Sequence, residues 1–214
     1  MRFAAMVPTS AATVKLPCMA SCATADLYLS VDVEADGPIP GPYSMLSLGL
    51  CVAGRFDGVS YERRDPAACT FYAELRPISE DYEPAALEVS RLDRDALMSS
   101  GVDPAVAMRD LAFWIADTAG DNRPIVCAYP AAFDWAFLYW YLRRFGPEPG
   151  PMSFSSCLDI KTMYAVKARV PFGRAGLDDL PASLRSSRSH THNALDDALQ
   201  QADVFSNIVE WNIS

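Results

Sequence analysis

Two carboxylates stand two residues apart at the end of an apolar run. Asp32 and Glu34 lie in VDVE, which closes the segment 27–34. In a β-strand the side chains of residues i and i+2 project from one face, so these carboxylates would lie side by side. Adjacent carboxylates repel unless a cation lies between them, and ligands that offer only oxygen suit Mg²⁺ or Mn²⁺. The alternative is a strand that has simply reached solvent, where DxE is common.

A third carboxylate, Asp134, stands among large apolar side chains in AAFDWAFLYWYL. An isolated buried charge is costly, so Asp134 must find a partner, face a cavity or be stabilised by backbone N–H groups at a helix start. The segment HNALDDA, residues 192–198, adds His192 and Asp197. A histidine just before a helix and an aspartate about one turn inside it can reach a common point. For a histidine on its own, an exposed loop residue is the alternative.

The elements that must position these residues follow from hydrophobic periodicity and from Gly and Pro. Strands are predicted over 27–34, 45–54, 70–77, 123–130 and 156–160. Helices are predicted over 104–119, 131–145, 160–168 and 193–210, with Asp159 as the N-cap of the third. Segments 37–45 and 170–191 are predicted loops, and 80–100 is helical or irregular.

This order of elements predicts one α/β domain. Short connections make the first three strands an antiparallel meander, and the later strand–helix alternation extends it to a mixed sheet flanked by helices. A chain of 214 residues suits a single domain, which we place at 26–214. Residues 1–25 are predicted to be a flexible extension or the product of a start codon assigned too early. Lys15 and two prolines interrupt the apolar run that a signal peptide needs, so export is not favoured.

Composition excludes several classes of protein. No apolar stretch approaches the roughly 18 residues of a membrane span. The six cysteines show no CxxC spacing, which argues against a zinc or disulfide framework and favours the cytoplasm. The net charge is −9, although residues 140–190 hold eight Lys/Arg against four Asp/Glu. This local excess is either an ordinary solvated surface or a basic rim that faces phosphates.

Together the three motifs resemble those of the DEDDh 3′→5′ exonucleases, the superfamily of ribonuclease T, oligoribonuclease and the proofreading subunit of bacterial replicative DNA polymerase. The first motif of that family, an apolar strand ending in DxE, is matched by VDVE. The second, FD near a helix start, is matched by Phe133 and Asp134. The third, H-x-A-x-x-D-A, is matched in full by HNALDDA, and the resemblance covers roughly residues 27–210.

The register of the third motif selects His192 over His190 and Asp197 over Asp196, because His190 has Leu195 five positions on. The chain also departs from the family. The polar pair ahead of FD and the Thr-Gly after DxE are replaced by Tyr129-Pro130-Ala131-Ala132 and by Ala35-Asp36-Gly37. These departures leave the carboxylates intact and put the choice of substrate in doubt.

The resemblance implies an RNase H-like fold with a mixed five-stranded sheet flanked by helices. It also implies two Mg²⁺ or Mn²⁺ ions, about 3.5–4 Å apart, held by Asp32, Glu34, Asp134 and Asp197. His192 would be the general base, since an imidazole with an ordinary pKa of about 6.5 suits neutral pH. Mononucleotides would leave the 3′ end of single-stranded RNA or DNA. Several relatives act as dimers, so the resemblance also allows a homodimer.

Contacts with substrate are expected further out. Met45 or Leu46 would stack with the terminal bases. Candidates for phosphate contacts are Lys161, Lys167, Arg169, Arg174, Arg185 and Arg188.

Two other functions compete with that of an exonuclease. A non-catalytic nucleic-acid or protein-binding module on the same fold would normally have lost a ligand, and a DxD-type sugar transferase leaves HNALDDA unexplained.

Overall fold

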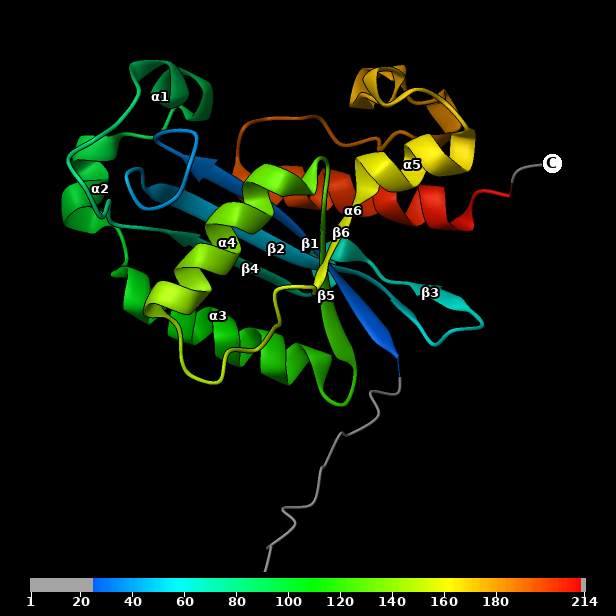
Figure 1. The fold of residues 1–214 in the computed structure, drawn as a ribbon, viewed down its shortest axis with the longest axis horizontal. Coiled ribbons are helices and arrows are strands. Elements are labelled where there is room, and N and C mark those ends of the chain that lie inside the picture. The colour runs from blue at the N-terminus through cyan, green and yellow to red at the C-terminus, as the bar shows by residue number, and fades with distance from the viewer. Residues whose placement is uncertain (1–24, 213–214) are drawn as a thin grey trace, which may run out of the picture.

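The computed structural model describes residues 25–212, so the predicted extension over 1–25 lies outside the described residues except for Ala25 (Figure 1). The strands are β1 (Asp26–Ala35), β2 (Met45–Phe56), β3 (Tyr61–Arg63), β4 (Thr70–Glu74), β5 (Arg123–Ala128) and β6 (Cys157–Asp159). The α-helices are α1 (Pro84–Ser90), α2 (Arg94–Ser100), α3 (Pro104–Ala119), α4 (Ala131–Phe145), α5 (Ile160–Ala168) and α6 (Ala194–Glu210). Short 3₁₀ helices are η1 (Pro66–Ala68), η2 (Phe172–Arg174), η3 (Leu177–Asp179) and η4 (Ala182–Leu184).

The strands form one mixed sheet in the order β3-β2-β1-β5-β6, and β4 pairs with β2. Pairing is antiparallel between β1 and β2 and between β2 and both β3 and β4, whereas β1, β5 and β6 run parallel. The predicted meander and mixed sheet are therefore confirmed. The prediction of five strands lacked β3, which is only three residues long and mostly exposed.

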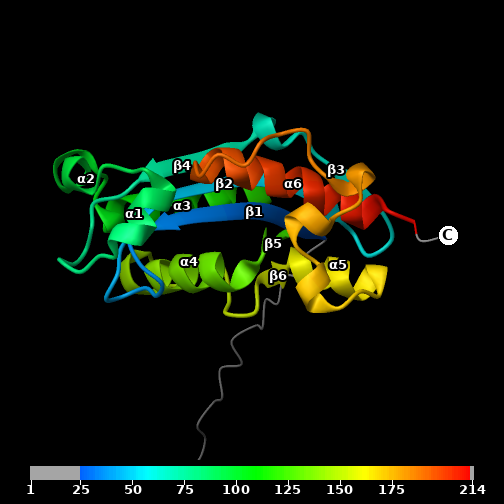
Figure 2. The same ribbon diagram turned by 90° about the horizontal axis from the view of Figure 1, so that it is seen from above.

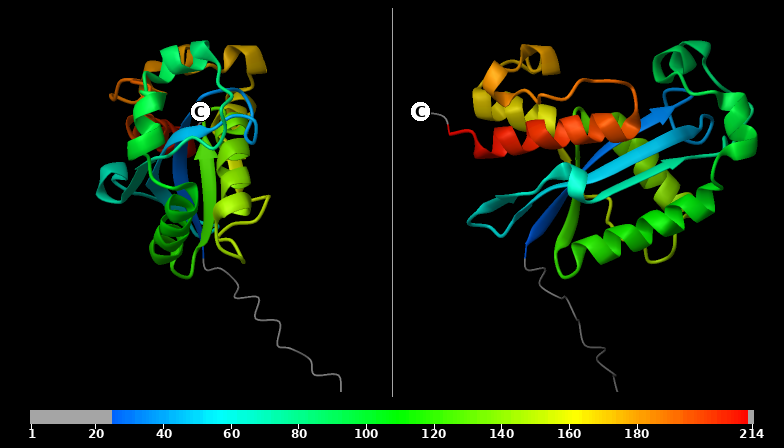
Figure 3. Two further views of the ribbon diagram at one scale, coloured as in Figure 1. Left: turned by 90° about the vertical axis from the view of Figure 1, so that its left-hand side faces the viewer. Right: turned by 180° about the vertical axis from the view of Figure 1, so that it is seen from behind.

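Helices cover the sheet on both faces. In the view from above, β1 runs between α4 on one side and α6 on the other (Figure 2). Seen from behind, α6 lies across the strands, with α3 along the lower part of the molecule (Figure 3). The first core joins β1 and β2 to α3 and α4, and the second joins β2 and β5 to α5 and α6. The central strands are thus packed on both sides.

Strand β2 shows what this two-sided packing does to the sequence pattern. Its first ten residues are all buried, including Met45 and Leu46, which have no exposed surface. A strand buried on both faces needs small or apolar residues at every position, not only at alternate ones. The prediction that Met45 or Leu46 stacks with substrate bases is therefore wrong.

No helix among residues 25–212 is both long enough and apolar enough to cross a membrane.

Candidate active site

Strand β1 loses its neighbour on one side just before the two carboxylates. Its parallel pairing with β5 ends at Ser30↔Cys127, while its pairing with β2 continues to Ala35. The backbone N–H groups of the last part of β1 on the β5 side would therefore lack a strand partner. Asp134, in the first turn of α4, fills this gap, because its Oδ1 accepts the N–H of Val33 at 2.9 Å. This bond holds Asp134 beside the carboxylates that flank Val33.

Helix α4 takes this position partly through Asp159, which sequence alone assigned to α5. The carboxylate of Asp159 accepts the N–H of Thr162 at 2.6 Å, so the predicted cap of α5 is confirmed. Its other oxygen accepts the N–H of Ala131 at 2.7 Å, at the start of α4. One side chain therefore stabilises two helix N-termini, and Pro130, the N-cap of α4, needs no side-chain acceptor of its own.

Helix α6 brings the third motif to the other side of β1. Asp197 lies in its first turn and has no exposed surface. Its carboxylate accepts the N–H of Thr191 at 2.8 Å and the N–H of His192 at 2.9 Å. His192 has a φ of +60°, a conformation in which successive backbone N–H groups can converge on one anion. The loop before α6 is thereby fixed around the carboxylate.

A close approach of α6 to β2 makes this arrangement possible. Gly49 pairs with Asp32 across the sheet, and a Cβ at Gly49 would collide with the backbone of Ala194 at the start of α6. Only a glycine lets the helix come this near to the strand. The position of Asp197 relative to Asp32 therefore depends on Gly49, a residue without a side chain.

Oxygen atoms of Asp32, Glu34 and Asp197 lie within 4.8 Å of one another, close enough to share a cation. Asp134 adjoins them through its bond to Val33. The donors are carboxylate oxygens only, a set that fits a hard divalent cation rather than zinc. The residues present therefore fit the divalent metal that the motifs imply.

Burial and neighbouring carboxylates raise the pKa of three carboxyl groups in this cluster. Burial raises the pKa of Asp134 to about 8, against the opposing hydrogen bond from Val33. Burial, with the charge of Asp197 next, raises the pKa of Glu34 to about 7. The pKa of Asp32 is raised well above its usual range by burial and then by Asp134, Glu34 and Asp197. A bound cation would favour the ionised carboxylates.

Both histidines of the chain lie at this site. His190, which the register of the motif set aside, has its Nδ1 3.0 Å from Oδ2 of Asp197. The rings of His190 and His192 meet edge to face with centroids 4.4 Å apart. The position of His190 could not be predicted from the sequence, because spacing along a loop does not show which way its side chains turn.

Gln201 is a residue of the site that sequence reasoning missed. It is buried on α6 one turn after Asp197. Its Nε2 donates to Oδ1 of Asp32 at 2.7 Å, and its Oε1 accepts the N–H of Tyr129 at 2.6 Å. The available signal was a polar side chain four residues after Asp197, on the same mostly apolar face of the helix.

The loop after Glu34 is held by a buried ion pair. Asp36 has no exposed surface and accepts Nε of Arg94 at 2.9 Å. Its other oxygen accepts the N–H of Ser44. The Asp that replaces the expected Thr-Gly pair is thus a structural residue, which ties the Gly/Pro-rich loop 37–45 to α2.

The six basic residues proposed as phosphate contacts are mostly engaged elsewhere. Lys167 donates to the carbonyl oxygens of Ile208 and Val209 at the end of α6, so two of the three donors of its ammonium group are already used within the chain. Arg185 donates to the carbonyl oxygens of Leu180 and Asp178, and Arg188 donates to the carboxylate of Asp203. The ammonium group of Lys161 lies over the ring of Phe172. Arg169 ends α5, and Arg174 is exposed. Among residues 25–212, no hydrogen bond or ion pair joins any of the six to the five motif residues.

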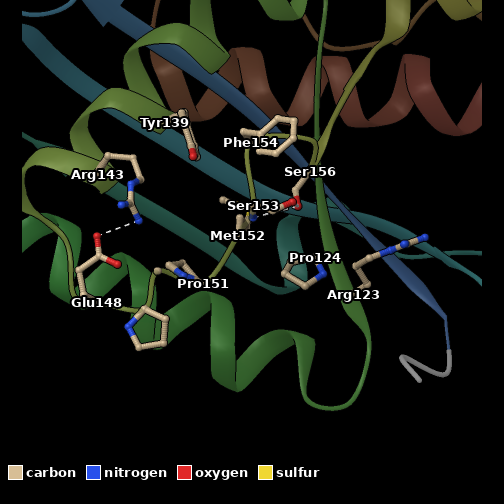
Figure 4. A pocket seen from close by; sticks show the side chains of 12 residues that line it. Arg123, Pro124, Tyr139, Arg143, Glu148, Pro151, Met152, Ser153, Phe154 and Ser156 are labelled. Carbon is tan, nitrogen blue, oxygen red and sulfur yellow. Dashed lines mark hydrogen bonds and ion pairs between the residues drawn. The ribbon is translucent and has the colours of Figure 1, made fainter. Parts of the chain in front are cut away.

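Two cavities differ in their relation to this group. One of about 380 Å³ adjoins Glu34 and is lined by Glu34, Ala35, Gly37, Pro38, Glu83, Ala85, Ala86, Val89 and Phe133. A larger one of about 610 Å³ lies between α4 and the loop before β6, where Tyr139, Arg143 and Phe154 are among the lining residues (Figure 4). The larger cavity contains none of the five motif residues.

Comparison with known proteins gives the same assignment as the geometry. Residues 87–209 match the family model described as the 3′-5′ exoribonuclease Rv2179c-like domain. A 3′-5′ DNA exonuclease of Escherichia coli, Cap18, is 35% identical over 182 residues, which cover 84% of this chain and 90% of that protein. The chain belongs to the 3′–5′ exonuclease family. This membership favours an enzyme over a non-catalytic binding module.

Solved exonuclease structures share the fold. The nuclease domain of 3′hExo, described as a DEDDh family member bound to rAMP, has a TM-score of 0.62 at 14% identity over 89% of this chain and 94% of that one. Pop2p of S. pombe, in a Mg²⁺ and Mn²⁺ bound form, has a TM-score of 0.55 at 19% identity over 85% and 82%. E. coli exonuclease I with a dA16 oligonucleotide has a TM-score of 0.57 at 15% identity over 83% of this chain, which spans 39% of that one. The predicted RNase H-like fold is thereby confirmed.

Proposed function

We propose that this member of the 3′–5′ exonuclease family removes mononucleotides from the 3′ end of single-stranded nucleic acid, with two Mg²⁺ or Mn²⁺ ions held by Asp32, Glu34, Asp134 and Asp197. The observation that carries the proposal is the oxygen cluster on β1 and α6, in which crowded carboxylates have raised pKa values. When bound, such cations lower the pKa of a water molecule and neutralise charge on the attacked phosphate.

The protein's own groups have separate roles. The four carboxylates would hold the cations, and Gln201 keeps Asp32 in place through its 2.7 Å hydrogen bond. His192 is partly exposed at the edge of the cluster, so its ring can receive a proton from the attacking water. The φ of +60° at His192 fixes the backbone from which that ring projects.

The cavity beside Glu34 is our candidate for the terminal nucleotide. It reaches the cluster through Glu34 itself, and it offers the ring of Phe133 and the apolar side chain of Val89. Both side chains are well exposed, at 39% and 50%, so a base can stack or pack against them. These residues take the role for which the sequence suggested Met45 and Leu46.

The test incubates 5′-labelled single strands of matched RNA and DNA sequence with the protein and Mn²⁺ and measures the lengths of the labelled products. We expect shortening from the 3′ end, and we expect His192→Ala to lower kcat by about 10²–10⁴-fold, the contribution of a general base. Asp32→Asn removes the charge of a proposed metal ligand and should lower kcat as well. The exposed variant Asp196→Asn, one residue from the ligand Asp197, should retain activity. Full activity of His192→Ala would sink the proposal.

The same assay decides between two substrates. The family model is described by its action on RNA, whereas the Cap18 relative is named for DNA. A rate for one oligonucleotide that exceeds the other at equal concentration shows which sugar the protein accepts.

A further inference from the structure

A second group of side chains that could hold a metal ion shares one member, Asp197, with the carboxylate cluster. Nitrogen atoms of His190 and His192 and an oxygen of Asp197 lie within 4.8 Å of one another. The exonuclease proposed above uses His192 and Asp197 but has no role for His190. The presence of a third ligand at this point is therefore not explained by that reaction.

The donor set differs in kind from the carboxylate cluster. Two imidazole nitrogens and one carboxylate oxygen suit Zn²⁺, Co²⁺ and Ni²⁺, whereas Mg²⁺ and Mn²⁺ prefer oxygen. Three protein ligands and one open position are the arrangement of many zinc sites. In a tetrahedron with bonds of about 2.0–2.1 Å, ligand atoms lie roughly 3.3 Å apart. Nδ1 of His190 and Oδ2 of Asp197, at 3.0 Å, are already near that separation.

The fold holds these ligands in place. Asp197 is fixed by two backbone N–H groups of the loop that carries both histidines. The two rings contact each other edge to face at 4.4 Å, so both lie on the same side of the loop. The side chain of His190 is 48% exposed, so an ion from solvent can reach it. Little rearrangement beyond a turn of the His192 ring is needed.

We propose that His190, His192 and Asp197 form a binding site for a transition-metal ion such as Zn²⁺, and that this site overlaps the exonuclease centre. Occupation of the site engages the imidazole nitrogen of His192 and a carboxylate oxygen of Asp197. An imidazole nitrogen bound to a cation has no lone pair with which to accept a proton. The ion is then an inhibitor, a consequence that rests on the proposed function, whereas the binding site itself does not.

Binding is tested without substrate, by adding Co²⁺ to the full-length protein and recording its visible absorption. We expect the d–d bands of a four-coordinate site with nitrogen and oxygen ligands, displaced by Zn²⁺. His190→Ala should weaken the affinity for Co²⁺ by about tenfold or more. Asp196→Asn is the matched control, since it removes a neighbouring carboxylate that binds Thr191 and lies outside the ligand group. Equal affinities in wild type and His190→Ala, or thiolate charge-transfer bands in place of d–d bands, would overturn the site.

The inhibition is tested separately, with Zn²⁺ added to the exonuclease assay in excess Mg²⁺. The Zn²⁺ concentration that halves the rate should be about tenfold or more higher for His190→Ala than for Asp196→Asn, each compared with its own rate without Zn²⁺. An unchanged ratio overturns the inhibitory role. Failure of the proposed function gives a different result, because no hydrolysis occurs in any variant while the Co²⁺ bands and their dependence on His190 persist.

Discussion

At the scale of single residues, the site gathers four carboxyl groups that repel one another when ionised, unless a cation lies between them. Asp134 on α4 and Asp197 on α6 are buried, and Asp32 and Glu34 on β1 are partly buried. Burial is the largest cause of the raised pKa in each of the three carboxyls that show one. Such groups retain protons in the folded state that the unfolded chain would release.

These raised pKa values predict that the protein becomes less stable as the pH rises when EDTA removes divalent cations. The unfolded carboxyl groups titrate near pH 4, whereas Glu34 and Asp134 titrate at about 7 and about 8 in the fold. Their contribution is therefore fully present below about pH 4 and is lost as the pH rises towards about 8. Because one pKa unit is about 1.4 kcal/mol, and 1 kcal/mol moves Tm by about 2–4 °C at this size, we expect Tm to fall between pH 5 and 8 by about 3–6 °C for each unit of raised pKa whose contribution is lost.

Calorimetry with and without Mn²⁺ checks this expectation. Mn²⁺ should raise Tm more at pH 8 than at pH 5, because it stabilises the ionised carboxylates. Asp134→Asn keeps an oxygen acceptor for Val33 but cannot ionise, so its Tm should depend less on pH than that of the wild type. A Tm that rises over this pH range in EDTA would contradict the account.

Sequence predicted the charged members of the site because their motifs have fixed spacing. It could not predict Gln201 or His190, whose roles depend on which way side chains turn across two different elements. It misjudged Met45 and Leu46 because alternation along a strand does not show whether the second face is also covered.

At the scale of elements, the site depends on how closely α6 lies against the sheet. The start of α6 contacts β2 at Gly49, opposite Asp32 on β1. The helices over 104–119 and 131–145 were predicted with their observed bounds, because their apolar periodicity is long and Pro or Gly marks their ends. The short helices α1 and α2 were not resolved within 80–100, since seven residues carry too little periodicity.

Gly49→Ala tests the close approach directly. The added methyl group has no room beside Ala194, so α6 must move away from β2 and carry Asp197 away from Asp32. We expect a loss of about 1–3 kcal/mol of unfolding free energy, together with weaker Mn²⁺ binding measured by calorimetric titration. Gly173→Ala is the matched control, because nothing lies within 4 Å of its added Cβ. Equal Mn²⁺ affinity in the two variants would show that α6 tolerates the methyl group without displacement.

At the scale of the whole molecule, the distribution of charge determines how strongly electrostatic attraction contributes to binding of a nucleic acid. The net charge is −9, and of the eight basic residues between 140 and 190, four form hydrogen bonds or ion pairs within the chain and two more lie over aromatic rings. Of the two readings of this local excess, an internally bonded surface is the better description. Few lysine and arginine side chains therefore remain to displace counterions from a bound strand.

The salt dependence of binding measures how many basic side chains neutralise phosphates of a bound strand. For single strands the logarithm of the binding constant falls with the logarithm of salt concentration with a slope of about −0.7 for each phosphate neutralised. We expect a slope no steeper than about −2, measured by fluorescence anisotropy with Asp134→Asn in Ca²⁺ to suppress hydrolysis. A slope near −5 would instead require a basic rim of several free side chains.

The two hydrogen bonds of Gln201 have a consequence for the sign of the charge beside Asp32. A primary amide has one accepting end and one donating end, and the N–H of Tyr129 claims the accepting end. The donating end must then face Asp32, whatever the state of the metal site. The backbone N–H of Tyr129, just after β5, thus orients the amide of Gln201 so that Asp32 on the neighbouring strand faces its N–H group. A Gln201→Glu substitution would satisfy Tyr129 equally well and yet present Asp32 with a like charge.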